Sequence, residues 1–159
     1  MGFGGSYIAT ANQVAPGILG PDSRVDINIH SYNSVTQGTW AYLSNASYYD
    51  YTIMYNGGSL ANGDEIVYNV HLSAGTYTLE VTCNKGDAAG IMKVYLDTTV
   101  IATNDLYAAA VSNGNRLTTT AIAVASNGMY SLKMKVEGKN AASTGYALNF
   151  STISMWRTA

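Results

Sequence analysis

Residues 66–83 read IVYNVHLSAGTYTLEVTC, and this stretch decides the fold class. Apolar side chains recur at every second position on both sides of the break at Ala74-Gly75. They are Ile66, Tyr68, Val70 and Leu72 before the break, and Tyr77, Leu79, Val81 and Cys83 after it. A period of two places alternate side chains on opposite faces of a sheet, and glycine suits a tight turn. The stretch therefore predicts two consecutive strands, each with one buried face.

The same period recurs along most of the chain from residue 25 onward. It is found in residues 25–30, 49–55, 92–97, 130–137 and 146–155, with Asn- and Gly-rich turns between the runs. Turns at intervals of roughly 8–12 residues are typical of an all-β sandwich or barrel. No long window shows a helical stripe. We expect an all-β, antiparallel β-sandwich of jelly-roll type, with about eight to ten strands.

The last of these runs changes its phase partway along. Leu148 and Phe150 keep one parity, whereas Ile153 and Met155 take the other. One extra residue in a strand produces such a shift, because two residues then face one residue of the partner strand. The sequence therefore predicts a β-bulge near Ser151 and Thr152.

The first 24 residues differ from the rest, because glycine and proline break any period and no charge precedes Asp22. We interpret residues 1–24 as an N-terminal arm and residues 25–159 as the sandwich domain. The arm is more apolar than a free linker needs. Its candidate contacts with a neighbouring subunit are Phe3, Tyr7, Ile8, Ile18 and Leu19. The alternative is that the segment lies on its own domain.

Composition limits the possible partners. Charged residues make up only 11% of the 159 residues, the net charge is −2, and Lys and Arg form no cluster. Nucleic acid and anionic membrane surfaces are therefore not expected as partners. No apolar run approaches the roughly 20 residues of a membrane-spanning helix. The start lacks the basic and apolar regions of an export signal, so we expect synthesis in a host cytoplasm.

Catalytic and metal-binding groups are sparse. His30 and His71 have no partner at ligand spacing, and Cys83 falls at an inward position where a thiol is inert. Glu80 and Glu137 fall at outward strand positions, and Glu65 is assigned to a turn, so no pair of carboxylates is placed for hydrolysis. We expect no enzyme activity, no metal site and no cofactor.

Aromatic and small side chains are more informative than charges. Tyr48, Tyr49 and Tyr107 are candidate platforms on which sugar rings would stack, although Tyr49 shares the predicted inward parity of Ile53 and Tyr55. A second feature is the uncharged strand around residue 122. If Ile122 points inward, three alanines point outward and form a candidate interface: Ala121, Ala123 and Ala125. An internal sheet contact would explain these alanines equally well.

Several phrases of the chain carry a resemblance: LSAGTYTL (72–79), VYLD (94–97), NGMYSL (127–132) and GKNAASTGY (138–146). Over roughly residues 36–158, the chain resembles the jelly-roll domains of tailed-phage virion proteins: capsid decorations, head fibres and tail-fibre tips. These domains are themselves similar to carbohydrate-binding modules. Where that pattern usually has Asp-Gly in a hairpin, this chain has Asp97-Thr98-Thr99.

The resemblance implies a non-enzymatic phage structural protein on the virion surface. It would decorate a capsid or form a head fibre, bind the major capsid protein or another virion protein, and form a homotrimer. The arm of residues 1–24 would anchor it to the capsid or to a neighbouring subunit. The alternative is a carbohydrate-binding module that recognises a cell-surface glycan during host adhesion, either in a tail fibre or as a glycan-binding protein. β-Sandwiches host many roles, so the motifs specify the fold more than the function.

Overall fold

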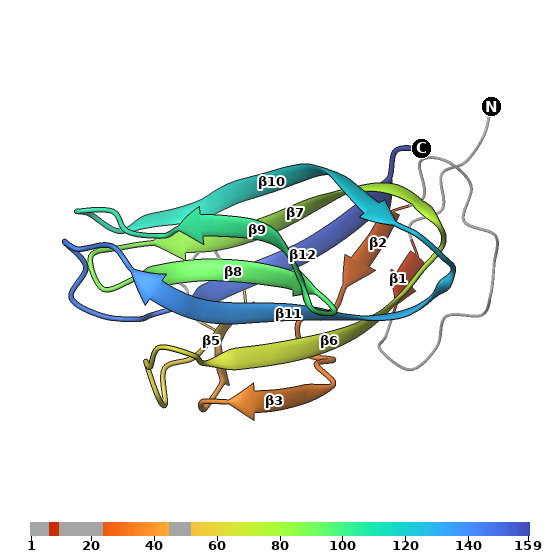
Figure 1. Ribbon diagram of the computed structural model, residues 1–159. Coiled ribbons are helices and arrows are strands. Elements are labelled where there is room, and N and C mark those ends of the chain that lie inside the picture. Colours follow the sequence, from red (N-terminus) through yellow and green to blue (C-terminus); the bar gives the residue numbers. More distant parts are fainter. Residues whose placement is uncertain (1–6, 10–23, 45–51) are drawn as a thin grey trace.

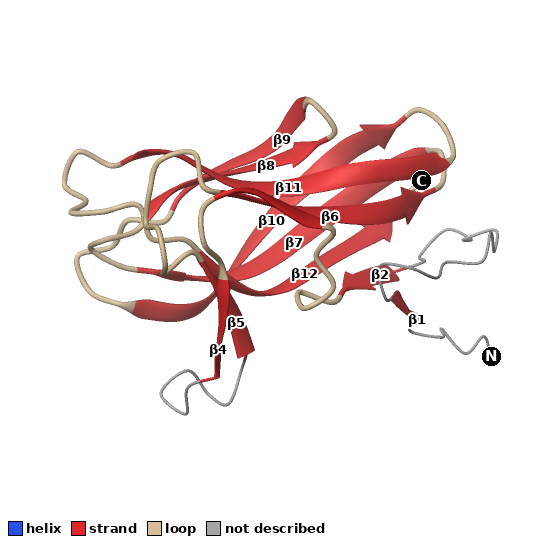
Figure 2. Cartoon of the chain, turned by 90° about the horizontal axis from the view of Figure 1, so that it is seen from below, coloured by secondary structure: helices blue, strands red, loops and turns tan. Residues whose placement is uncertain are grey.

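The computed structural model describes residues 7–9, 24–44 and 52–159 of the chain. Every regular element in these ranges is a strand, and the strands form two sheets that face each other (Figure 1). Figure 2 shows the same two layers from below. Among the described residues, no helix has the length and apolar character needed to span a bilayer. The all-β sandwich predicted from the alternating pattern is confirmed.

The larger sheet has seven strands built around β12 (Asn149–Arg157). On one side β12 pairs with β7 (Gly75–Lys85), and β10 (Ser112–Val124) forms the edge beyond it. On its other side β12 pairs along one part of its length with β2 (Arg24–Ile27), and β1 (Tyr7–Ala9) pairs with the far side of β2. Along another part β12 pairs with β5 (Thr52–Tyr55), and β4 (Ala41–Ser44) pairs with the far side of β5. The pairing of β1 with β2 is parallel.

The smaller sheet has five antiparallel strands. Their spatial order is β3 (Ser34–Gln37), β6 (Glu65–Leu72), β11 (Gly128–Lys139), β8 (Gly90–Leu96) and β9 (Thr99–Asp105). The two sheets therefore end in β9 and β10 on one side of the sandwich.

The core consists of the inward side chains of both sheets. Tyr68, Leu72, Tyr77 and Leu79, from the stretch that decides the fold, are all at most 1% exposed. The two buried tyrosines keep partners for their hydroxyl groups. Tyr68 Oη donates to the carbonyl of Ile29 at 3.0 Å, and Tyr77 Oη donates to that of Ser73 at 2.9 Å. Both rings therefore pack in the core without an unpaired hydroxyl.

The bulge predicted in the last strand is present. Phe150 pairs with Cys83 and Thr152 pairs with Thr82, so the register shifts by one residue between them. The shift lets both Phe150 and Ile153 point into the core. It also places Thr152 on the outer face of the larger sheet, which becomes important below.

The predicted face of β5 is wrong for Tyr55. Ile53 and Tyr55 were expected to point inward, but Met54 is the residue of β5 in the main core cluster, at 1% exposure, and Tyr55 is only partly buried. Ile53 is also buried, at 3%, but lies outside that cluster. Met54 pairs with Phe150 of β12, and directly paired residues share a face of the sheet. A one-residue change in register exchanges the two faces of a strand, so Tyr55 lies on the outer side. Glu65 likewise begins β6 instead of lying in a turn.

The predicted association surfaces are only partly within the described residues. Phe3, Ile18 and Leu19 lie outside them, whereas Tyr7 and Ile8 form part of β1. The three alanines 121, 123 and 125 are exposed while Ile122 and Val124 are buried, as the alternation predicted. Ala121 has a φ of +59° at a register shift between β10 and β7. Its role in an interface stays a prediction.

Candidate functional site

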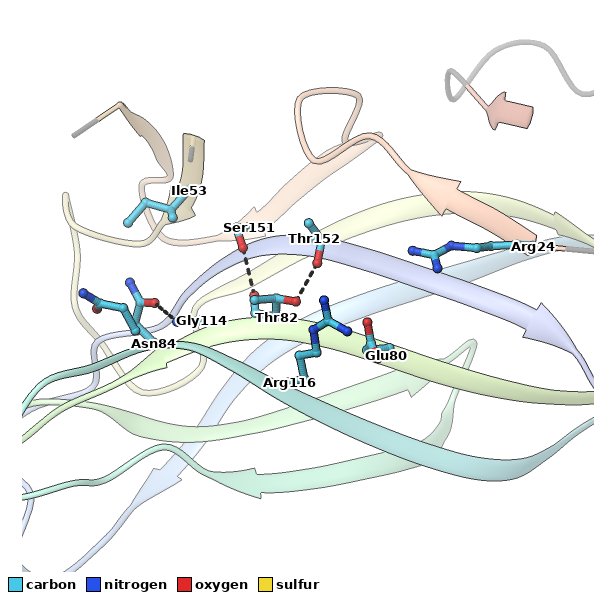
Figure 3. A pocket seen from close by; sticks show the side chains of 10 residues that line it. Arg24, Ile53, Glu80, Thr82, Asn84, Gly114, Arg116, Ser151 and Thr152 are labelled. Carbon is cyan, nitrogen blue, oxygen red and sulfur yellow. Dashed lines mark hydrogen bonds between the residues drawn. The ribbon is translucent and has the colours of Figure 1, made fainter. Parts of the chain in front are cut away.

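A depression of about 260 Å³ lies on the outer face of the larger sheet (Figure 3). Its floor is formed by side chains that alternate with core residues on three neighbouring strands. Leu79, Val81 and Ile153 point into the core. Their neighbours therefore point outward: Glu80 and Thr82 from β7, Thr152 from β12, and Arg116 from the facing β10.

Polar groups line this floor. Thr152 Oγ1 donates to Thr82 Oγ1 at 2.7 Å, and Asn84 Oδ1 accepts the backbone N–H of Gly114 at 3.1 Å (Figure 3). Asn84 is only 8% exposed, yet its Nδ2 makes no hydrogen bond within the described part of the chain, and neither does Oδ1 of Asn113. One buried donor and one buried acceptor without a partner in the described ranges therefore belong to residues that line the depression.

One rim of the depression is a closed charged network. Arg24 Nε lies 2.6 Å from Asp26 Oδ1, and Arg24 Nη2 donates to Ser154 Oγ at 2.9 Å. Ser154 Oγ donates in turn to Asp26 Oδ1 at 2.6 Å. By contrast, neither Glu80 nor Arg116 forms an ion pair with any residue in the described ranges. Their charges are available to a ligand.

A second depression, of about 240 Å³, lies at the loop end of the same face. Tyr55, Lys85, Asp87 and Asn149 line it, and it shares Ile53 and Asn84 with the first depression. The two depressions together are called the groove below. The Tyr55 ring lies directly against Gly57, where an added Cβ would come within 2.3 Å of Tyr55 Cε1. Glycine at position 57 therefore makes room for the ring.

The loop end is held by a buried polar pair. Asn56 and Asp64 are 0% and 1% exposed, and Asn56 Nδ2 donates to Asp64 Oδ2 at 2.8 Å. Asn56 Nδ2 also donates to the carbonyl of Tyr146 at 3.0 Å, and Asn56 Oδ1 accepts the N–H of Leu148 at 2.8 Å. Asp64 Oδ2 further accepts hydrogen bonds from Ser59 Oγ and the Ala61 N–H. The loop after β5 is thus fastened to the segment that leads into β12.

The three tyrosines predicted to bind sugar do not lie together in the groove within the described residues. Tyr48 and Tyr49 lie outside the described residues. Tyr107 is half-buried beside the loop end, where it forms a bridge with Gly86 and its N–H donates to Asp105 Oδ1 at 2.9 Å. It is not among the residues that line the groove.

Sequence reasoning missed the residues that do line the groove. Tyr55 was assigned to the core, and Glu80 was interpreted as a solvated surface group. The available signal was the parity opposite to Leu79 and Val81, combined with the bulge that turns Thr152 outward. No local pattern brings Arg116 beside them, because that depends on pairing between β10 and β7.

The candidates for a nucleophile and for metal ligands in the described part of the chain are Cys83 and groups of His, Cys, Asp or Glu side chains. Cys83 is 1% exposed, and burial raises the pKa of its thiol to about 11, so it stays protonated at neutral pH. In the ranges that the structure describes, no three His, Cys, Asp or Glu side chains are grouped to hold a metal ion.

No family model matches the sequence, and no curated protein matches it. Solved structures do match. A xanthan lyase from Paenibacillus has a TM-score of 0.69 at 20% identity, over 92% of this chain but only 14% of the lyase. The CBM36-1 domain of a xylanase from the hindgut metagenome of Trinervitermes trinervoides has a TM-score of 0.61 at 12% identity, over 83% of this chain and 95% of that domain. A family 6 carbohydrate-binding module from Clostridium cellulolyticum, in complex with xylose, has a TM-score of 0.56 at 17% identity, over 83% and 95%. At such identities the likeness concerns the fold, and the chain is similar in fold to carbohydrate-binding modules.

Proposed function

We propose that this protein binds carbohydrate without catalysis, and that the sugar lies in the groove. The observation that carries the proposal is the groove itself: hydroxyl, amide and charged side chains converge on one sheet face, with the ring of Tyr55 at its loop end. Sugars present many hydroxyl groups, each able to donate and accept hydrogen bonds, together with apolar C–H faces that pack on aromatic rings. The likeness to carbohydrate-binding modules supports the same function.

The carboxylates on this face of the sheet are not placed as a free pair for glycoside hydrolysis. Hydrolysis needs two carboxyl groups that are both free to act on substrate and water. Glu80 of the groove and Asp26 beside it flank Ser154 on opposite sides in the sheet. Asp26 is engaged by Arg24 and Ser154. The proposal is therefore binding and not bond cleavage.

Titration calorimetry with xylo- and cello-oligosaccharides, followed by a glycan array, tests this function. We expect Tyr55→Ala and Arg116→Ala each to weaken binding by about 5- to 30-fold, because each removes one contact worth about 1–2 kcal/mol. Tyr95→Ala is the matched control, since Tyr95 lies on β8 of the other sheet. Equal losses in all three variants, or silence of the wild type on every glycan, would refute the proposal.

The virion location is a separate proposal, which rests on the sequence resemblance. The solved structures described above include no virion protein, and nothing in the groove distinguishes a phage protein from any other glycan-binding protein. Light scattering of the purified chain tests the predicted homotrimer. A trimer would support a decoration function, which binding assays with the major capsid protein would then test. A monomer would count against it.

A further inference from the structure

An exposed pair of aromatic rings lies beside β2 and β4. The rings of His30 and Tyr42 stack with their centroids 4.2 Å apart and an interplanar angle of 26°. Tyr42 is 40% exposed, and so is Tyr32 in the segment that follows His30. Burial raises the pKa of Tyr42, and the charge interaction with Tyr32 raises it further. Large rings exposed together are unusual, because rings of this size normally pack in a core or contact a ligand.

The ring pair is fixed in place by the backbone. Tyr42 Oη donates to the carbonyl of His30 at 3.0 Å, and the N–H of His30 donates to Asn28 Oδ1 at 2.9 Å. These contacts hold the turn against β4 without burying the rings. A ligand that stacks on them would therefore lose little side-chain freedom on binding, because the rings are already ordered.

One member of the pair, His30, lines a depression that is continuous with the groove. His30 and Asn28 line a third shallow depression of about 480 Å³ on the outer face of the larger sheet. This depression shares Arg24, Ser151 and Thr152 with the floor of the groove. A path lined by side chains thus leads from Tyr55 at the loop end, across Thr152, to His30 beyond β2. From β10 to β2 it crosses three strand intervals, or about 14 Å.

We propose that His30 and Tyr42 form a second stacking platform, and that the ligand is a chain of several linked sugars. This inference rests on the proposed function, since the platform extends the same groove. One part of the oligosaccharide occupies the groove near Tyr55, and a unit further along the chain stacks on the free face of His30. The charges along the path balance, because three basic and three acidic residues line it: Arg24, Lys85, Arg116, Asp26, Glu80 and Asp87. A neutral glycan fits such a lining better than a polyanionic one.

Binding as a function of oligosaccharide length tests this proposal. The probes are xylo- and cello-oligosaccharides from the dimer to the hexamer, measured by titration calorimetry with the full chain. Wild-type affinity should rise with length, and Tyr42→Ala and His30→Ala should each remove about 3- to 10-fold of affinity for the hexamer while leaving the dimer unchanged. Tyr42→Phe keeps the ring and should keep the length dependence. Met129→Ala, an exposed side chain on β11 of the other sheet, is the control.

The outcomes separate the two proposals. If the wild type binds no probe of either series and no glycan of the array, the proposed function fails and the platform fails with it. If Tyr55→Ala weakens every length but Tyr42→Ala and His30→Ala weaken none, the groove stands and the platform is refuted. Melting temperatures equal to wild type within the error of the assay confirm that a weakened variant is folded. A variant that melts early is replaced by Tyr42→Leu, which removes the ring but keeps apolar volume.

Discussion

Asn56→Ala is expected to destabilise the fold more than any exposed substitution. The change leaves the N–H of Leu148 and the carbonyl of Tyr146 without their partner, and it takes one of the donors from the buried Asp64 carboxylate. A buried group left unpaired costs about 1–3 kcal/mol, and more when it is charged. With the backbone groups near the low end of that range, the free energy of unfolding should fall by about 3–5 kcal/mol.

Urea denaturation followed by intrinsic fluorescence measures this loss. With a slope of about 2 kcal/mol per molar urea, the midpoint should fall by about 1.5–2.5 M. Asn69→Ala is the matched control, because Asn69 lies on the outer side of β6 and makes no side-chain hydrogen bond within the described residues; its effect should stay within about 0.5 kcal/mol. Loss below about 1 kcal/mol for Asn56→Ala, or equal losses in both variants, would refute the reasoning.

The isosteric change Asn56→Asp sharpens the test. It keeps an acceptor for the Leu148 N–H but sets a second carboxyl group against Asp64. Two carboxylates in contact raise the pKa of one of them in the folded state. The variant should therefore recover stability as the pH is lowered through that raised pKa, and it should recover more than Asn56→Ala, which sets no second carboxyl group against Asp64. Parallel pH profiles for the two variants would contradict the assigned contact.

Three further predictions concern single positions. Ala121→Gly should stabilise the protein by about 0.5–1 kcal/mol, because Ala121 has a φ of +59° at an exposed bulge; an unchanged melting temperature would count against strain at that residue. The Cys83 thiol should not react with a thiol reagent at neutral pH until urea unfolds the chain, since it is buried and its pKa is raised to about 11; rapid labelling of the native protein would contradict its burial. The pKa of the Asp105 carboxyl is lowered by the hydrogen bond from Asn140 and by that from the Tyr107 N–H. The ionised carboxylate therefore stabilises the folded state above its unfolded pKa of about 3.9, and this stability is lost as the pH falls through the folded pKa. Asp105→Ala should thus lower the melting temperature slightly at pH 7 and not at pH 2, and a deficit that persists in acid would refute this.

The sequence predicted what alternation alone determines. The inward faces of β6, β7, β8 and β11 follow directly from a period of two, and the bulge in β12 follows from its change of phase. The face of β5 could not be read in this way, because Ile53, Met54 and Tyr55 are all large and apolar enough for a core. Only pairing with Phe150 decides between them. The groove was hidden for the same reason, since its floor combines residues from strands far apart in the chain.

The alternation within β7 and β12 separates two tasks that many proteins must perform with the same residues. Leu79, Val81 and Ile153 maintain the fold, while Glu80, Thr82 and Thr152 between them face the solvent in the groove. Substitution at the second set changes the surface of the groove without opening a void beneath it. The scaffold is therefore suited to evolving or engineering new specificities one position at a time, and a library randomised at 80, 82, 116 and 152 should remain largely folded.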